Sequence, residues 1–293
     1  MSSDWIQIAS HIAEVTGKPF TPVENRDVAG GCINHTVVLS DGIDRWFIKL
    51  NDARKLDMFE AEAAGLDELD ESNTIRVPKP LCHGLVGNRC YLVMEYIQMG
   101  SPNRESSKLA GRALAEMHKK RSNHFGWKRD NTIGSTPQPN TQSDDWIAFY
   151  REQRLGFQLE LAARNGYGGR LARQGSKLMA CFPGLIDHDP EASLLHGDLW
   201  GGNIAYDEEG LPLIFDPAVY YGDREADLAM TELFGGFNSD FYAAYNEIWP
   251  LDPGYTIRKK LYNLYHVLNH VNLFGGGYLS QAQSMIDRLL AEC

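Results

Sequence analysis

The sequence lacks an excess of basic residues, a long apolar run and a basic, apolar leader, and each absence excludes a class of protein. Its 28 Lys and Arg residues are outnumbered by 39 Asp and Glu residues, whereas nucleic-acid-binding proteins usually carry a basic footprint. No apolar run is long enough to cross a bilayer, and the N-terminus does not resemble a signal peptide. We therefore expect neither a nucleic-acid partner nor a membrane partner.

The sequence also has few cysteines, and none of them are in a CxxC motif. The five are Cys32, Cys82, Cys90, Cys181 and Cys293. An odd number without metal-type or redox spacing predicts a reduced, cytoplasmic protein. Cys32 is a separate case because it lies in a glycine-containing loop, where converging N–H donors favour the thiolate. It is either an unreactive small residue or a redox-sensitive thiol, so the protein is predicted to be a monomer or a redox-dependent homodimer.

Apolar periodicity predicts an α+β fold with two lobes. The first lobe, residues 1–97, is predicted as a nucleotide-binding unit with a helix over 4–16, a hairpin over 36–50, a helix over 56–69 and a second hairpin over 81–96. The second lobe, residues 98–293, is predicted to be mostly helical, with helices over 105–121, 144–165, 168–181, 225–248 and 256–274. One hairpin, over residues 203–216, interrupts these helices. Residues 131–143 are expected to form a long functional or mobile loop.

The strongest chemical signal is the segment from His196 to Asn203, followed by Asp216 at the end of the hairpin. Phosphoryl transfer needs an oriented acceptor hydroxyl and neutralised phosphate charge rather than covalent help from the protein. Asp198 precedes Asn203 by five residues, which is the catalytic-loop spacing of kinases. The pattern predicts Asp198 as the catalytic base and Asn203 and Asp216 as Mg²⁺ ligands, since hard oxygen donors suit this ion.

A lysine and a glutamate in the first lobe support this interpretation. Lys49 lies in an apolar strand, where an unpaired buried charge would be costly, and strand alternation places it on the same face as Phe47. Glu62 falls on the inward stripe of the following helix, whereas Glu60 falls on its outer face. The pattern predicts that Lys49 binds ATP phosphates and that Glu62 is its partner.

Two further segments are expected to contact ATP. The loop that includes Gly30, Gly31, Cys32, Ile33 and Asn34 supplies backbone N–H groups suited to phosphate, although it lacks the full GxGxxG pattern. Residues Glu95, Tyr96 and Ile97 end the first lobe and are predicted to form a hinge whose backbone binds adenine.

Several polar residues have both a functional and a structural interpretation. His196 is expected to brace the loop rather than carry a proton, and Asp227 is expected either to anchor that loop or to act as a helix N-terminal charge. Asn269 and His270 lie among apolar residues of the last predicted helix. They are expected to line an acceptor pocket, with an interior structural role as the alternative.

The motifs together resemble the fructosamine/ketosamine 3-kinase family. The resemblance rests on Leu195-His196-Gly197-Asp198-Leu199-Trp200-Gly201-Gly202-Asn203, Phe215-Asp216-Pro217-Ala218, Tyr221-Gly222-Asp223-Arg224-Glu225, Phe125-Gly126-Trp127, Asp130-Asn131-Thr132-Ile133-Gly134-Ser135-Thr136, Asp145-Trp146 and Leu268-Asn269-His270. It extends from about residue 17 to residue 288 and implies a protein-kinase-like fold related to aminoglycoside phosphotransferases and choline kinases. It also implies ATP and Mg²⁺ as cofactors.

The resemblance further implies a substrate. Trp200 would line a sugar pocket, and the acceptor would be the O3 hydroxyl of a free or protein-bound ketosamine, whose 3-phosphate releases the amine. Two alternatives remain at this stage. One is a kinase of the same fold acting on an aminoglycoside, an amino alcohol or another hydroxylated metabolite. The other is a non-catalytic nucleotide sensor. The presence of all five kinase residues argues against it; these are Lys49, Glu62, Asp198, Asn203 and Asp216.

Overall fold

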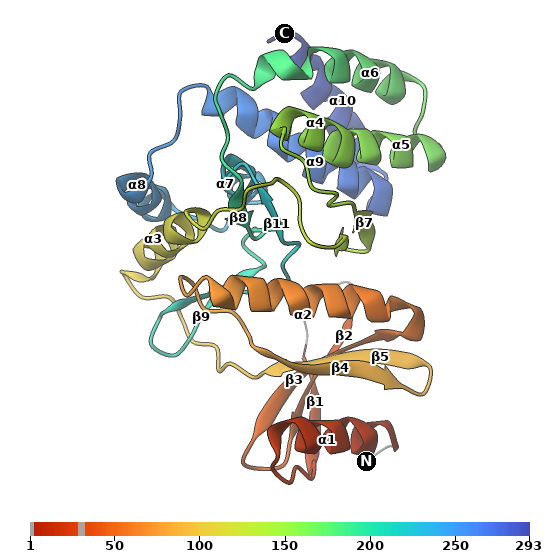
Figure 1. The fold of residues 1–293 in the computed structure, drawn as a ribbon, viewed down its shortest axis with the longest axis vertical. Coiled ribbons are helices and arrows are strands. Elements are labelled where there is room, and N and C mark those ends of the chain that lie inside the picture. Colours follow the sequence, from red (N-terminus) through yellow and green to blue (C-terminus); the bar gives the residue numbers. More distant parts are fainter. Residues whose placement is uncertain (1–2, 29–32) are drawn as a thin grey trace.

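The computed structural model describes residues 3–28 and 33–293 and has two parts, a sheet-based part and a mostly helical part (Figure 1). The sheet contains β1 (Glu24–Asp27), β2 (His35–Ser40), β3 (Arg45–Asp52), β4 (Pro80–Val86) and β5 (Arg89–Glu95). Their order is β1-β2-β3-β5-β4, and every neighbouring pair is antiparallel. The fold is α+β, as predicted.

Side chains alternate along a strand, so this sheet presents apolar residues on both faces. Each face is covered by a helix. On one face, Ile48 and its neighbours pack against α1 (Ser3–Thr16). On the other, Leu92 and Met94 pack with Phe59 and Leu66 of α2 (Leu56–Glu71). In Figure 1, α2 lies between the sheet and the helical part. Lys49 pairs across the sheet with Leu92 and therefore shares the face that α2 covers.

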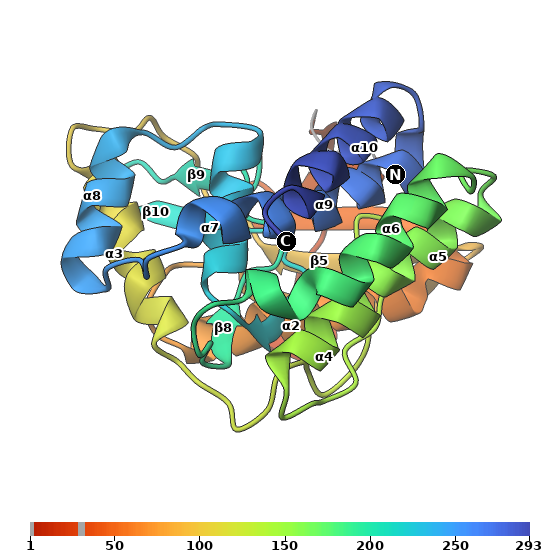
Figure 2. The same ribbon diagram turned by 90° about the horizontal axis from the view of Figure 1, so that it is seen from above.

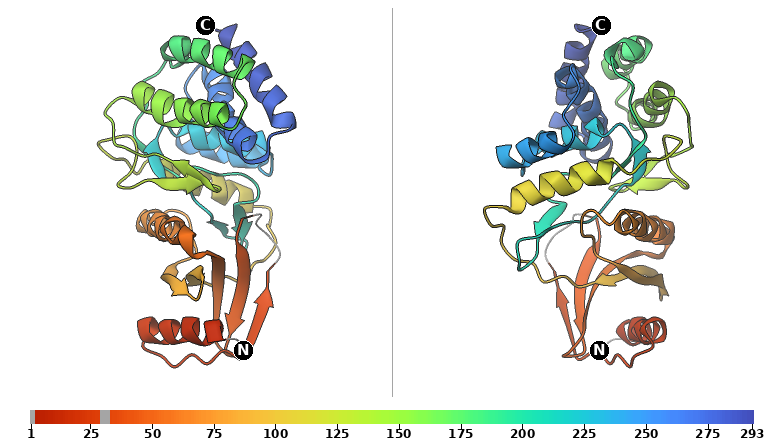
Figure 3. Two further views of the ribbon diagram at one scale, coloured as in Figure 1. Left: turned by 90° about the vertical axis from the view of Figure 1, so that its right-hand side faces the viewer. Right: turned by 60° about the vertical axis from the view of Figure 1, so that its left-hand side comes forward.

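The helical part surrounds one large hydrophobic core and includes three short strand pairs. Its helices are α3 (Ser106–His118), α4 (Trp146–Tyr150), α5 (Phe157–Arg164), α6 (Arg170–Cys181), α7 (Glu225–Leu233), α8 (Ser239–Ile248), α9 (Tyr255–Phe274) and α10 (Gly277–Leu290). The strand pairs are β6 (Asn131–Ile133) with β7 (Thr136–Gln138), β8 (Ser193–Leu195) with β11 (Tyr220–Gly222), and β9 (Ile204–Tyr206) with β10 (Pro212–Ile214). Figures 2 and 3 show α9 and α10 side by side, on the far side of α2 from the sheet.

Three predicted elements differ from the structure. The helix expected over 225–248 is two helices, because Gly235 and Gly236 take positive φ angles of 76° and 104°, which helical residues do not adopt. The helix expected over 144–165 contains a π-helical turn at Arg151–Gly156 between α4 and α5. The helix α10 was not predicted.

The expected loop over 131–143 is also different, since it contains the β6–β7 hairpin and is fixed by buried side chains. Gln138 donates from Nε2 to Ala218 O at 3.0 Å, and Asn131 donates from Nδ2 to Val219 O at 2.8 Å. The buried Arg154 guanidinium donates to Asn140 Oδ1 at 2.6 Å. Buried polar groups need such partners, so this segment is part of the core and holds the chain that follows Asp216.

The prediction of a reduced protein is wrong for two cysteines. A disulfide joins Cys181, at the end of α6, to Cys293, near the end of α10, with their Cα atoms 6.1 Å apart. They are 112 residues apart in sequence, so their proximity depends on the packing of α6 against α10. Cys82 and Cys90 are buried free thiols. Within residues 3–28 and 33–293, no helix is both long and apolar enough to cross a bilayer.

Candidate active site

The segment 196–203 leaves β8 and is closed by the chain that follows β10. Phe215 N donates to Asn203 O at 3.1 Å, and Ala218 N donates to His196 O at 2.8 Å. Gly197 makes this closure possible, because it has a φ of 82° and a Cβ there would lie 2.0 Å from Ala218 O. The β9–β10 hairpin thereby returns Asp216 to the loop that carries Asp198, as the sequence pattern requires.

Asp227, on α7, holds the backbone of this loop. Its two carboxylate oxygens accept from His196 N at 2.7 Å and from Gly197 N at 2.8 Å, and one also contacts His118 Nε2 at 3.2 Å. Burial alone would raise the pKa of Asp227, but these hydrogen bonds and the nearby His118 hold it below the usual value. Asp227 is therefore a buried carboxylate that anchors the loop, which is one of its two predicted roles.

His196 braces the same loop with both ring nitrogens. Nε2 donates to Phe215 O at 3.0 Å, and Nδ1 accepts from Asp198 N at 3.2 Å. The side chain is fully buried, and burial lowers its pKa. A neutral ring with both nitrogens occupied does not exchange protons, which agrees with the predicted bracing role.

Three oxygen-bearing side chains meet at the open end of the loop. Asn203 donates from Nδ2 to Asp198 O at 2.8 Å, with Asp198 Oδ2 at 3.4 Å, which leaves its Oδ1 as an acceptor. Asp216 takes a φ of 57°, and non-glycine residues held in this region often lie at functional sites. Burial, with the charges of Asp216 and Asp227, raises the pKa of Asp198 to about 7.

Lys49 connects the sheet to this group of side chains. Its Nζ donates to both Glu62 of α2 and Asp216. Burial would lower the pKa of this lysine, which is 4% exposed, but the two carboxylates raise it above its ordinary value, so Lys49 stays cationic. Glu60, by contrast, lies 4.0 Å from Arg129 on another face of α2. The pairing of Lys49 with Glu62 rather than Glu60 is therefore confirmed.

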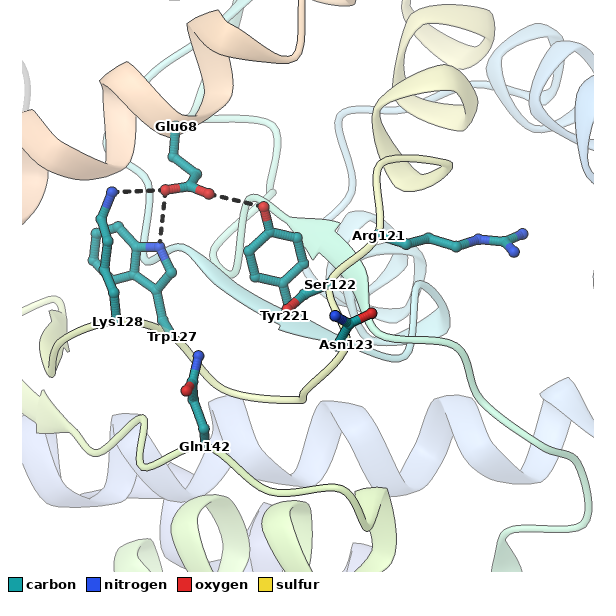
Figure 4. Close-up of a pocket in the computed structure, with 8 residues that line it drawn as sticks. All are labelled: Glu68, Arg121, Ser122, Asn123, Trp127, Lys128, Gln142 and Tyr221. Carbon is teal, nitrogen blue, oxygen red and sulfur yellow. Dashed lines mark hydrogen bonds and ion pairs between the residues drawn. The ribbon is translucent and has the colours of Figure 1, made fainter.

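A second carboxylate on α2 attaches this helix to the helical part of the protein. Glu68 accepts from Lys128 Nζ and Tyr221 OH, each at 2.8 Å, and from Trp127 Nε1 at 3.3 Å. Figure 4 shows these three donors converging on Glu68 beside a cavity of about 370 Å³. Sequence reasoning missed this contact, although Trp127 and Tyr221 belong to two of the motifs that carry the family resemblance. Because α2 also carries Glu62, Glu68 sets where that residue lies.

We expect Glu68→Ala to lower stability and weaken ATP use together. It leaves the buried indole N–H and the phenol without their acceptor, which costs about 1–3 kcal/mol for such groups. We expect the KM for ATP to rise by about 3- to 10-fold, as a shifted α2 moves Glu62 away from Lys49. Thermal unfolding and steady-state kinetics would measure both effects. The matched control is Glu60→Ala on the same helix, and equal losses in the two variants would contradict the role of Glu68.

The predicted hinge lies at the end of β5 beside a second cavity. Glu95 N donates to Lys79 O at 2.8 Å, and its carboxylate binds Arg76, so neither its N–H nor its side chain is directed to a nucleotide. Tyr96 borders a cavity of about 440 Å³, also lined by Val38 on the sheet face that carries Lys49. Ile97 is buried. Adenine binding by the backbone of this segment stays a prediction.

Three residues of the predicted phosphate loop lie outside the described residues, namely Gly30, Gly31 and Cys32. The redox role of Cys32 therefore stays a prediction. Asn34 accepts from Asn51 Nδ2 at 2.7 Å. Ile33 lies against the β6–β7 turn, where a Cβ on Gly134 would be 3.3 Å from its Cδ1. The end of this loop therefore contacts the helical part of the protein.

The residues predicted to line the acceptor pocket lie in different environments in the structure. Trp200 is 39% exposed and its ring crosses Gly202, where a Cβ would lie 2.3 Å from the indole. Asn269 is instead 3% exposed, donates to Ile133 O at 3.3 Å and contacts Gln158 at 3.4 Å. Because the Asn269 amide is used inside the core, the structure favours the interior structural role that was the alternative for this residue. His270, one position later on α9, is only partly buried.

Comparison with known proteins agrees with this geometry. The family model for fructosamine kinase matches residues 4–292. A protein named as a probable ketoamine kinase from Synechocystis sp. is 50% identical over 98% of this chain and 97% of its own length. A chloroplastic protein-ribulosamine 3-kinase from Arabidopsis thaliana is 48% identical over 90% of this chain and 81% of its own length.

Solved structures show the same fold. A crystal structure of a protein assigned as a fructosamine-3-kinase from Haemophilus somnus has a TM-score of 0.88 and 29% identity, covering 98% of this chain and 97% of that one. A choline kinase from Streptococcus pneumoniae has a TM-score of 0.66 at 14% identity over both full chains. That distant likeness supports the protein-kinase-like fold alone. From the family model and these relatives, the chain belongs to the fructosamine kinase family.

Proposed function

We propose that this protein is an ATP-dependent ketosamine 3-kinase. The observation that carries the proposal is the meeting of Asp198, Asn203 and Asp216 with the cationic Lys49, which is itself paired to Glu62. Family membership and the names of the relatives support the same substrate class. Together they favour phosphoryl transfer to a ketosamine hydroxyl.

The oxygen donors at this site fit Mg²⁺, which prefers carboxylate and amide oxygens. Asn203 Oδ1 and the Asp216 carboxylate would hold the ion, which would neutralise charge on the ATP phosphates. Lys49 would bind phosphate oxygens, and the backbone from Glu95 to Ile97 would bind adenine, with the loop from Gly30 to Asn34 beside the phosphates.

Asp198 would orient the acceptor hydroxyl and take its proton. As the sugar oxygen forms its bond to the terminal phosphorus of ATP, the bond from that phosphorus to the bridging oxygen breaks and ADP leaves. With a pKa raised to about 7 before metal and substrate bind, the carboxyl is more basic than an ordinary aspartate. A pKa close to the working pH suits a general base.

We place O3 of a ketosamine at Asp198, with Trp200 beside the sugar. The 3-phosphate would lie on the carbon next to the C2 carbonyl. When the C1 proton is lost and a C1–C2 enaminol forms, the bond from C3 to the phosphate oxygen can break, and water hydrolyses the resulting C1 imine to release the amine. The kinase would therefore produce a ketosamine 3-phosphate, whose breakdown gives a deglycated amine or protein. Cytoplasmic ATP would supply the phosphate.

A panel of acceptors tests the proposal. A coupled assay of ADP release should show turnover with ribulosyl-lysine or fructosyl-lysine, and ³¹P NMR should show a sugar 3-phosphate before elimination. Choline and kanamycin should give at least about 100-fold lower kcat/KM, because a site that hydrogen-bonds one substrate leaves polar groups unpaired with another. Turnover of kanamycin or choline without turnover of either ketosamine would overturn the proposal.

A further inference from the structure

Aromatic side chains continue from the catalytic loop across the helical part of the protein. Trp200 contacts Phe234 with ring centroids 6.2 Å apart, and Phe234 contacts His270 at 5.0 Å. His270 then contacts Tyr278 at 4.9 Å and Phe274 at 5.5 Å. We call these five residues the aromatic strip. They come from the catalytic loop, the end of α7, α9 and α10.

Much of this strip is open to solvent. Trp200 is 39% exposed, Phe234 is 40% exposed and Phe274 is 61% exposed. Single exposed apolar residues are ordinary, but a contiguous exposed apolar surface marks an interaction site. Because the strip is continuous with the loop that carries Asp198, a ligand on it would also be at the reaction site.

Three glycines fix the start of the strip. Gly201 and Gly236 pack backbone to backbone, so that a Cβ on Gly236 would lie 2.5 Å from Gly201 Cα. This contact holds Phe234 beside the catalytic loop, while Gly202 leaves room for the Trp200 ring. The motif Trp200-Gly201-Gly202 is thereby explained by packing, and the strip has a fixed geometry before a ligand binds.

The segments that carry the strip have few Lys and Arg residues, which favours a cationic ligand. The sequence has no Lys or Arg between Arg224 and Arg258, and none between Lys260 and Arg288. The three cations at the start of α9 are neutralised: Arg258 pairs with Glu225 at 2.6 Å, Lys259 with Glu232 at 2.6 Å and Lys260 with Glu292 at 3.4 Å. They also lie ten or more residues before His270, about 15 Å along the helix. Among the described residues, none of the recorded cation–π contacts involves a ring of the strip.

His270 adds a hydrogen-bond acceptor in the middle of the strip. Its Nδ1 lies 2.7 Å from His266 O, and only a protonated nitrogen can donate to a carbonyl. In the neutral ring, Nε2 therefore carries a lone pair. Aromatic faces and one such acceptor form a combination that binds an ammonium group carrying hydrogens.

We propose that the aromatic strip binds the amine side of the substrate, namely the secondary ammonium that links the sugar to a lysine chain. This inference rests on the proposed ketosamine 3-kinase function. The sugar hydroxyl must reach Asp198, so the substituent that leaves the sugar runs away from the loop, in the direction of the strip. At neutral pH this amine is cationic, and cations are attracted to aromatic faces.

The test compares a cationic substrate with a neutral one. The first is a blocked peptide that contains fructosyl-lysine or ribulosyl-lysine, and the second is the same peptide with the ketosamine nitrogen acetylated. The variant is Phe234→Leu with Phe274→Leu, which keeps apolar area but removes the aromatic face next to Trp200 and the most exposed face of the strip. The control is Leu85→Ala, which changes a 56% exposed side chain on β4 of the sheet.

We expect the double variant to raise the KM for the cationic peptide by about 3- to 30-fold, the range of a cation–π contact. The kcat, the KM for ATP and the melting temperature should stay within about 2-fold or 2 °C of the control, and the KM for the acetylated peptide should not rise. An unchanged KM for the cationic peptide, or an equal rise for both peptides, would overturn the inference alone. If the wild-type protein phosphorylates neither fructosyl-lysine nor ribulosyl-lysine, the proposed function and this inference are both wrong.

Discussion

Asp198→Asn is expected to reduce kcat by about 10²- to 10⁴-fold, the usual contribution of a positioned general base. Asparagine keeps the shape of the side chain and its contact with Asn203 but cannot take the hydroxyl proton. Binding of metal-free ATP should be nearly unchanged, because Lys49 and the hinge are not altered. Single-turnover kinetics with a ketosamine, together with nucleotide titration, would measure the two quantities separately. Turnover close to wild type would show that another group accepts the proton.

The same substitution should make the metal-free protein more stable. Burial raises the folded-state pKa of Asp198 to about 7 from an ordinary 3.8, so the ionised form is disfavoured by folding. Stability therefore falls as the pH rises from about 4 to about 7, and asparagine removes this loss. We expect Asp198→Asn to raise the melting temperature in EDTA by about 2–6 °C at pH 8.

Two measurements separate this effect from a general change in the loop. At pH 4 the carboxyl is protonated in the folded state and only partly ionised in the unfolded state, so the gain should be much smaller than at pH 8. Adding Mg²⁺ and ATP at pH 8 should stabilise the wild-type protein more than the variant, because a nearby cation favours the carboxylate. A gain that is equal at pH 4 and pH 8 would contradict the assigned pKa.

Local spacing was enough to predict the features that depend on one element or on neighbours in the chain. The helical face of Glu62 follows from the apolar residues around it, and the structure pairs it with Lys49. The two hairpins of the sheet are bounded by turn residues. The return of Asp216 to the catalytic loop follows from the short hairpin that connects them.

Features that depend on long-range packing were not predicted. Glu68 meets Tyr221 across 153 residues, and no local pattern identifies that partner. The disulfide depends on α10, which begins at the last of three consecutive glycines, and these conceal its start in the sequence. Asn269 and His270 are adjacent in sequence, but a helix turns about 100° per residue, so one faces the core and the other the surface. To predict these different environments one would need the position of the β6–β7 hairpin, where Ile133 O accepts a hydrogen bond from Asn269.

Asp227→Asn should have the opposite effect to Asp198→Asn on stability, although Asp227 anchors the same loop that carries Asp198. Each oxygen of Asp227 accepts from a separate backbone N–H, on His196 at 2.7 Å and on Gly197 at 2.8 Å. The amide of asparagine would place an NH₂ donor against one of these donors. Breaking a buried, hydrogen-bonded charge arrangement in this way costs about 3–5 kcal/mol.

We expect Asp227→Asn to lower the melting temperature by about 6–12 °C at pH 7 and to reduce kcat, because the loop loses the anchor that orients Asp198. The folded-state pKa of Asp227 lies below its ordinary value of 3.8, so its contribution is present at neutral pH and is lost as the pH falls below about 4. The difference in melting temperature between Asp227→Asn and wild type should therefore become smaller at acidic pH. Differential scanning calorimetry from pH 3 to pH 8 would measure it, with Asp240→Asn on the exposed surface of α8 as the control. A loss that does not depend on pH, or that the control reproduces, would show that the Asp227 carboxylate is not what holds the loop.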